Sequence, residues 1–172
     1  MIDWRVQIVT GGHRQWRSIN YNESFHSEAK TPSCVVLAHA VKHNWEIHQI
    51  NVKSAYLNAK LDCPLYMKPL HGYLRPGQEG KVCLLLKCLY GLVQASRGWY
   101  LDTSGMMVAE LGFKRSSVDH SIFIWELKLG KDLIVAVATD DMMVIRNSIA
   151  TVNRFKMELS HQYHITDLGE LH

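Results

Sequence analysis

The stretch VAVATDDMMVI, residues 135–145, is the most informative local feature of the sequence, because two acidic residues interrupt two apolar runs. β-Branched and other apolar residues favour strands, and a short polar break between two such runs is typical of a hairpin. The sequence therefore predicts two antiparallel strands, over residues 132–138 and 142–146, with Asp140 and Asp141 presented at their tip.

The two adjacent carboxylates at this tip need a partner or water. Burying an unpaired charge costs several kcal/mol, so we expect both side chains to face solvent, a cation or both. Mg²⁺ is usually held by one or two carboxylates together with substrate phosphates, and polymerases use two such ions about 3.5–4 Å apart. The plainer interpretation is a hairpin turn that happens to read Asp-Asp, because Asp is common in turns. The dipeptide alone favours that interpretation.

Further elements are predicted on both sides of the hairpin from periodicity and from helix start and stop residues. They are an N-terminal strand over 4–9, a helix over 31–44, a strand over 45–52, short strands over 65–68 and 81–87, a helical stretch over 90–111 that Gly112 ends, a strand over 121–127, and a last helix capped by Asn147 or Ser148. The apolar residues of that last helix are Ile149, Val152, Phe155, Met157 and Leu159. This order indicates an α+β fold, with an antiparallel sheet and helices packed on one face.

Composition narrows the class of protein. The chain has 172 residues, of which 47% are hydrophobic, which suits one domain, with room for two lobes. A formal charge of +3 permits an anionic partner without establishing one. The cysteines form no close-spaced pair, so we expect free thiols; they are Cys34, Cys63, Cys83 and Cys88. The chain has neither an apolar run of about 20 residues nor a signal-like start, which predicts an intracellular protein, cytoplasmic or nuclear, that is not secreted and has no membrane partner.

One pair of histidines has the spacing of a metal site. His39 and His43 lie four residues apart on the predicted helix, and His48 is near in sequence. No Glu or Cys completes a zinc motif, so we interpret them as solvated or core-edge residues. The sequence also lacks a Ser-His-Asp order and a Gly-rich phosphate loop, and nothing else in it suggests a hydrolase or a dehydrogenase.

Seven blocks, in order and at characteristic spacing, resemble the reverse transcriptases of Ty1/copia-type retrotransposons. The resemblance runs from about Arg5 to the last residue. The blocks are YNESF, WEIHQINVKSAYLNAKL, LYMKP, KCLYGLVQASRGWY, LGFKRSSVDHSIF, VAVATDDMMV and ITDLGEL. A co-linear series of this kind is far more specific than any single motif.

The resemblance implies a single domain with the fingers and palm of a right-hand polymerase. Residues 1–30 or so would form a finger hairpin arm and residues 31–172 the palm with finger insertions, without the thumb and RNase H regions. It also implies an RNA or DNA template-primer and deoxynucleoside triphosphates as partners. Three carboxylates would bind two Mg²⁺ ions. Two of them map onto Asp140 and Asp141, whereas the third position is Asn51.

Asn51 sets the expectation for activity. Its amide offers a neutral oxygen where the site requires a charged ligand. Three more residues carry over as nucleotide-binding residues: Tyr56 beneath the incoming sugar, Gln94 near the nucleotide and template, and Arg5 toward the triphosphate. Without the resemblance, Tyr56 reads equally well as a half-buried tyrosine and Gln94 reads better as a solvated helix residue. A basic position of the family is here Gln7.

Two hypotheses follow from the sequence. The first is an RNA-directed DNA polymerase domain that performs two-magnesium nucleotidyl transfer and is impaired or inactive in this copy. The alternative is a non-catalytic relic of a retroelement that at most binds nucleic acid. The sequence leaves the oligomeric state open.

Overall fold

The computed structural model describes residues 7–24, 31–70, 72–126, 133–146 and 148–171. The chain divides into two compact units, and each is described separately below. The first unit comprises residues 1–25 and 56–99, and the second comprises residues 26–55 and 100–172. Among the described residues, no helix is long and apolar enough to cross a membrane.

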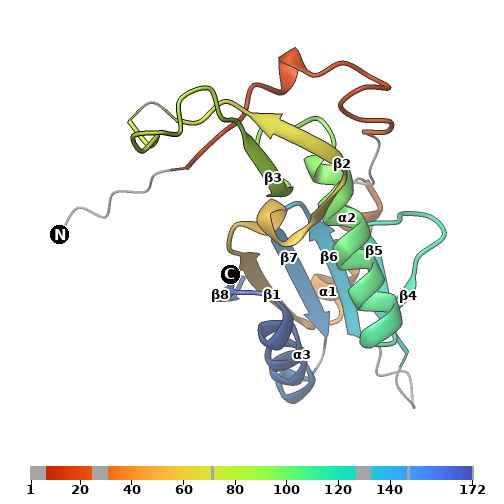
Figure 1. Ribbon diagram of the computed structural model, residues 1–172. Coiled ribbons are helices and arrows are strands. Elements are labelled where there is room, and N and C mark those ends of the chain that lie inside the picture. The colour runs from red at the N-terminus through yellow and green to blue at the C-terminus, as the bar shows by residue number, and fades with distance from the viewer. Residues whose placement is uncertain (1–6, 25–30, 71, 127–132, 147, 172) are drawn as a thin grey trace. The chain divides into compact units, whose positions relative to one another are not determined.

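The second unit is built on a six-stranded sheet in the order β4-β5-β6-β7-β1-β8 (Figure 1). Every neighbouring pair in it is antiparallel, as the sequence predicts. The strands are β1 (Glu46–Val52), β4 (Lys114–Arg115), β5 (Ile122–Trp125), β6 (Leu133–Ala138), β7 (Asp141–Arg146) and β8 (Ile165–Glu170). The predicted hairpin is β6 and β7, which lie at the centre of the sheet.

The helices of this unit cover both faces of the sheet, so the expectation of helices on one face is wrong. On one face, Ala40 of α1 (Thr31–Lys42) packs against Ile47 and Ile145. On the other, Lys156 of α3 (Ile149–Gln162) contacts His48, whose side chain points away from that of its neighbour Ile47. Figure 1 shows α1 behind the sheet and α3 in front. Adjacent residues of β7 are fully buried, so both faces need a cover.

The helix boundaries and faces also differ from the prediction. Helix α2 (Ala95–Gly105) begins five residues after Tyr90 and continues as a π-helix, η3 (Met106–Glu110), before Gly112 turns the chain with φ of +73°. Helix α3 follows Ser148 but buries Val152, Phe155, Lys156 and Leu159, whereas Ile149 and Met157 are 44% and 64% exposed. Buried positions thus recur every three or four residues. Met157 lies off that stripe, whereas Ile149 lies at its edge and is the first residue of the helix.

Two strands were not predicted. β4 has only two residues, and β8 has the mixed sequence ITDLGE. β8 is an edge strand that pairs with β1 alone, with a register shift between Gln49 and Ile50. Edge strands tolerate polar residues because one side faces solvent, so such a strand carries little periodic signal.

The first unit contains a two-stranded antiparallel sheet, β2 (Lys60–Met67) and β3 (Cys83–Lys87). The 3₁₀ helix η1 (Gly12–Arg14) also belongs to this unit, as does η2 (Ala55–Asn58) from Tyr56 onward. The strand expected over residues 4–9 is not formed in its described part, 7–9, where Val9 makes only an isolated bridge to Tyr90. The rest of that predicted strand lies outside the described residues.

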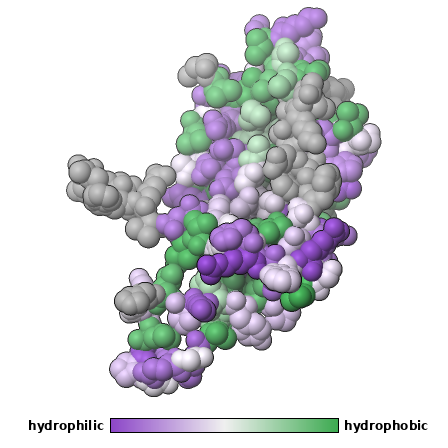
Figure 2. Space-filling view, turned by 90° about the horizontal axis from the view of Figure 1, so that it is seen from above, coloured by the Kyte–Doolittle hydropathy of each residue, from purple (hydrophilic) through white to green (hydrophobic). Residues whose placement is uncertain are grey.

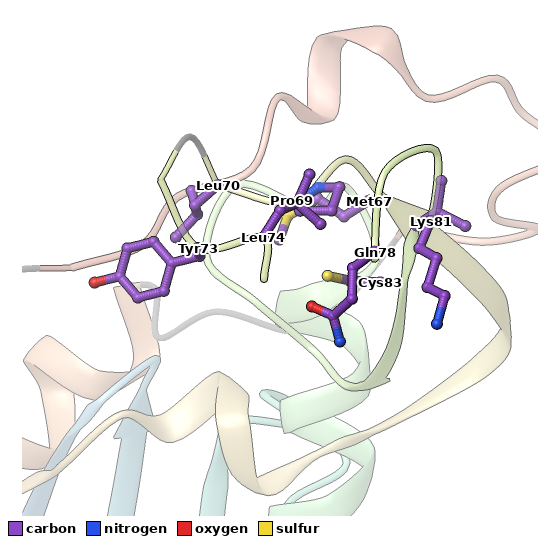
Figure 3. A pocket seen from close by; sticks show the side chains of 9 residues that line it. Met67, Pro69, Leu70, Tyr73, Leu74, Gln78, Lys81 and Cys83 are labelled. Atoms are coloured by element: carbon purple, nitrogen blue, oxygen red, sulfur yellow. The ribbon is translucent and has the colours of Figure 1, made fainter. Parts of the chain in front are cut away.

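A cavity of about 320 Å³ lies in the first unit at the ends of β2 and β3 (Figure 3). Met67 and Cys83 come from the strands, and the connecting segment supplies mostly apolar residues together with Gln78 and Lys81. No residue predicted for the functional site lines it.

Figure 2 shows apolar residues interspersed with hydrophilic ones on the face seen from above. Large apolar side chains are exposed on β3, including Leu86 at 79%.

An ion pair between the buried Lys156 and the half-exposed Asp167 joins α3 to the edge strand of the second unit. Lys156 Nζ donates to Asp167 Oδ1 and Oδ2 at 2.7 and 2.9 Å and lies 3.0 Å from His48 Nδ1. Partial burial alone would raise the pKa of Asp167. Hydrogen bonds from Lys156 and from the Gly169 N–H, with the nearby positive charge, outweigh that effect, so the pKa of Asp167 lies below its ordinary value.

This ion pair predicts an acid-dependent loss of stability. Because folding lowers the pKa of Asp167, its contribution is complete above the unfolded-state value near 3.8 and is lost as the pH falls through the folded-state value. We expect the native chain to be more stable than Asp167→Asn at neutral pH, with the difference shrinking below about pH 4. Urea unfolding of both proteins across this range measures it, and a difference independent of pH would contradict the assignment.

Candidate active site at the Asp140–Asp141 hairpin

The hairpin between β6 and β7 places the two acidic residues differently. Asp140 lies in the turn, after Thr139, whose φ of +55° is in the left-handed region. Asp141 is the first residue of β7 and pairs with Ala138 across the hairpin. The tight turn thus brings both carboxylates to one end of the central strands, as the sequence predicts.

Asn51 lies directly opposite Asp141 on β1. Its Nδ2 donates to Asp141 Oδ1 at 3.3 Å, and Gln49 Nε2 donates to the same oxygen at 3.3 Å. The Val52 N–H donates to the Asp140 carbonyl at 2.7 Å, which fixes the turn against β1. Residues 90 positions apart in sequence are thereby joined into one cluster.

Gln49 was not predicted as a member of this cluster. It lies two residues before Asn51, and side chains two residues apart on a strand share a face. That alternation was the available signal. The consequence is that one oxygen of Asp141 accepts hydrogen bonds from two neutral amides.

The acidic cluster is partly shielded from solvent. Asn51, Asp140 and Asp141 are all half-buried, and the Asp140 Oδ1 atom is inaccessible to solvent. Interactions between charges are stronger in such a place than on an open surface. A cation bound at the hairpin would therefore be held more firmly than one at an exposed carboxylate.

The residues of the cluster include the type of ligand that a hard divalent cation prefers, but they supply only two carboxylates. Asp140 and Asp141 supply the carboxylate oxygens that Mg²⁺ prefers. Asn51 contributes an amide, and its nitrogen points toward Asp141. Within the described ranges, no group of three or more His, Cys, Asp or Glu residues is placed to hold a metal ion. The cluster thus has one negative charge fewer than a site with three carboxylates.

Gln94 belongs to the first unit and is 3% exposed, so it is not the solvated helix residue that the sequence alone favours. Its Oε1 accepts a hydrogen bond from Gln15 Nε2 at 2.9 Å, and its Nε2 donates to the Asn20 carbonyl at 3.0 Å. Gln15 Oε1 in turn accepts from the Val93 N–H at 2.8 Å. Gln15 was missed because its partners lie 78 and 79 residues away, and no local pattern marks it.

Tyr56 also belongs to the first unit, in η2. It is half-buried, and its ring centroid lies 4.5 Å from that of Tyr90. Arg5 lies outside the described residues, and Gln7 is exposed. Only Asn51, Asp140 and Asp141 among the predicted site residues are therefore joined within one unit.

The three histidines that we interpreted as solvated or core-edge residues lie in two different environments. His39 and His43 are exposed and lie against each other with ring centroids 4.3 Å apart, as expected for solvated residues. His48 is 7% exposed, with its Nε2 3.2 Å from Glu46 Oε2. That contact, with the one to Lys156, makes His48 part of a polar network of the second unit in which His48 and Lys156 are buried.

The family match and the similar proteins found by comparison agree with each other. The family described as "Reverse transcriptase (RNA-dependent DNA polymerase)" matches residues 2–172. The retrovirus-related Pol polyprotein from transposon RE1 of Arabidopsis thaliana is 32% identical over 171 residues, which are 98% of this chain. The corresponding polyprotein from transposon TNT 1-94 of Nicotiana tabacum is 28% identical over 170 residues. A putative transposon Ty5-1 protein of Saccharomyces cerevisiae is 30% identical over 122 residues, 71% of this chain.

These relatives are much longer than this chain. The aligned region spans 12% of the RE1 polyprotein, 13% of the TNT 1-94 polyprotein and 39% of the Ty5-1 protein. No solved structure matches the chain.

Proposed function

Because the chain belongs to the reverse transcriptase (RNA-dependent DNA polymerase) family, with Ty1/copia-type Pol polyproteins among its relatives, we propose that it forms the fingers and palm of an RNA-directed DNA polymerase. The observation that supports this most directly is the β6–β7 hairpin, which carries Asp140 and Asp141 opposite Asn51 of β1. We place the nucleotidyl-transfer site there, with reduced activity in this copy.

In the proposed site, Asp140 and Asp141 hold divalent cations, and an active family member would use two Mg²⁺ ions. When bound, they would supply positive charge that stabilises the attacking and leaving oxygens as a primer 3′-hydroxyl displaces pyrophosphate. The protein's contribution is to fix the carboxylates. The Val52 N–H holds the backbone of Asp140, and β1 holds Asp141 in register.

Asn51 is the proposed cause of the reduced activity. It is neutral, so the cluster has a smaller negative charge with which to hold cations beside a triphosphate. It also donates to Asp141 Oδ1, as does Gln49, and a metal ion that took this oxygen would have to compete with both amides. Both effects weaken cation binding without unfolding the sheet.

The substrates of the proposed reaction are an RNA or DNA template-primer and deoxynucleoside triphosphates. Tyr56, Gln94 and Arg5 are the proposed nucleotide-binding residues. The proposed role of Gln94 includes holding neighbouring segments in place, because its amide links Gln15 and Asn20 to the start of α2. A loop held in this way presents a fixed surface to a ligand.

The alternative is a retroelement relic that binds nucleic acid without turnover. The same Asn51 supports it, since a site that lacks one carboxylate can lose activity altogether. The two proposals agree on binding and differ on catalysis.

Primer extension on an RNA template with Mg²⁺ separates these two proposals. We expect slow incorporation by the native chain that requires Mg²⁺ and disappears in Asp140→Asn. Glu170→Asn serves as the control, because it removes an exposed carboxylate of β8 outside the hairpin. Incorporation that survives Asp140→Asn would refute the proposed site. Template-primer binding without incorporation, in this chain and in Asn51→Asp, would favour the relic.

A further inference from the structure

A small pocket lies on the face of the six-stranded sheet opposite to Asp141. Ile145 of β7 shares the Asp141 face, and its cross-strand partner Ile134 pairs with Ile124 of β5. The next residue, Trp125, therefore points to the other face. The pocket that Trp125 lines has a volume of about 120 Å³ and lies wholly within the second unit.

Three aromatic residues and Leu111 form the apolar part of this pocket. Phe113 stacks on Trp125 with centroids 5.6 Å apart and meets Phe155 edge to face at 5.5 Å. Phe113 and Phe155 are 2% and 1% exposed, whereas Trp125 is half-buried. The rings are thus fixed by packing, and part of the indole is accessible from the pocket.

Charged residues surround the aromatic floor. Glu110 and Glu158 supply two carboxylates, and Arg154 supplies one guanidinium. Arg154 Cζ lies 5.1 Å from the centroid of Trp125, within the range of a cation–π contact. The two carboxylates against one guanidinium leave an excess of negative charge around a ring that already has a cation over it.

A π-helix positions one of these carboxylates. η3 ends at Glu110, and the Leu111 N–H donates to the Met106 carbonyl at 3.1 Å with the wider i→i+5 spacing. Gln162 Nε2 donates to Glu110 Oε2 at 2.7 Å and orients the carboxylate further. π-Helical turns are rare and frequently occur at functional sites.

We propose that this pocket binds an organic cation, a guanidinium or alkylammonium group, and that Arg154 is its built-in competitor. The aromatic floor and the two carboxylates provide the two interactions that such a group needs. A volume of about 120 Å³ suits a head group and is far too small for a nucleotide. Because the pocket lies on the face opposite to Asp141, the ligand can bind without reaching the acidic cluster.

The competition makes a prediction that a purely structural role for Arg154 does not. Arg154→Ala removes the internal cation and uncovers the indole, so we expect affinity for an added guanidinium to increase about two- to fivefold. Glu158→Gln and Trp125→Leu should each weaken binding by a similar factor. Arg75→Ala, the same change of charge at an exposed residue of the first unit, should leave the affinity unchanged.

The experiment is an NMR titration of the native chain with ethylguanidinium chloride, following the indole N–H of Trp125, which the Trp125→Phe spectrum assigns. Titration with sodium chloride and with neutral N-ethylurea controls for ionic strength and shape. Glu158→Gln and Arg154→Ala are read on the same resonance, and Trp125→Leu on the Gln162 side-chain amide, which contacts Glu110. A capped Ala-Arg-Ala peptide and free spermidine then distinguish a side chain of a partner polypeptide from a free amine.

Saturable binding of ethylguanidinium that is strengthened by Arg154→Ala and weakened by Glu158→Gln supports the proposal. A shift that N-ethylurea reproduces, or an affinity that Arg154→Ala lowers, overturns it. Tighter binding of the peptide than of spermidine identifies a polypeptide side chain as the ligand, and the reverse order identifies a free amine. Either order is consistent with the proposed cation site.

Discussion

The Asn51→Asp variant is expected to extend a primer at least about a hundredfold faster than the native chain, because removal or restoration of one electrostatic group in an active site commonly changes rates by 10²–10³-fold. The substitution places a carboxylate opposite Asp141 and removes the amide that donates to it. Both changes favour binding of divalent cations beside the triphosphate. Single-nucleotide incorporation at saturating template-primer measures the effect.

Gln49→Glu is the matched control for this variant. Gln49 lies on the same strand face as Asn51, and its amide donates to the same oxygen of Asp141 at the same distance of 3.3 Å. The Gln49→Glu substitution therefore adds the same negative charge near the cluster, at a position outside the proposed ligand set. Equal activation by both substitutions would show that net charge matters and position does not. No gain from Asn51→Asp would refute the role given to Asn51.

Repulsion between two carboxylates is a second cause that would leave the Asn51→Asp variant without a gain in activity. Asp in place of Asn51 would bring two carboxylates together in the absence of a cation, so the variant should be less stable without Mg²⁺ and regain stability when it is added. Thermal unfolding with and without Mg²⁺ tests this separately from activity. A folded Asn51→Asp variant that Mg²⁺ does not stabilise would contradict metal binding at the hairpin.

Phe155→Ala is expected to lower the free energy of unfolding by about 3–5 kcal/mol, the cost of deleting a buried aromatic side chain and leaving a cavity. Phe155 is 1% exposed on α3 and meets Phe113 edge to face. A loss of this size is a large fraction of the stability of an ordinary domain. Urea unfolding followed by far-UV circular dichroism provides the measurement.

Met157→Ala, two residues further along the same helix, is the control for Phe155→Ala. Met157 is 64% exposed, so its truncation should change the free energy of unfolding by less than about 0.5 kcal/mol. Both residues were predicted from the sequence to lie on the apolar face of this helix. A comparable loss in the two variants would show that α3 packs through a different face.

Elements whose signals are local could be predicted from the amino-acid sequence. The apolar runs on either side of Asp140 and Asp141 were sufficient for the β6–β7 hairpin, because β-branched residues and a short polar turn act within a few residues of each other. Gly112 was correctly identified as the residue that follows a helical stretch, since a positive φ depends on the immediate backbone. The antiparallel sheet followed from the order of these elements.

Features that depend on partners distant in sequence became known only from the folded chain. The hydrogen bond from Gln49 to Asp141 spans 92 residues and the one from Gln15 to Gln94 spans 79, and nothing near either residue specifies it. Covering of both sheet faces, with Lys156 rather than Met157 turned inward, likewise depends on which surfaces meet. Local propensity fixes the backbone conformation of a segment, whereas burial and hydrogen-bond partners are fixed only when separate segments pack together.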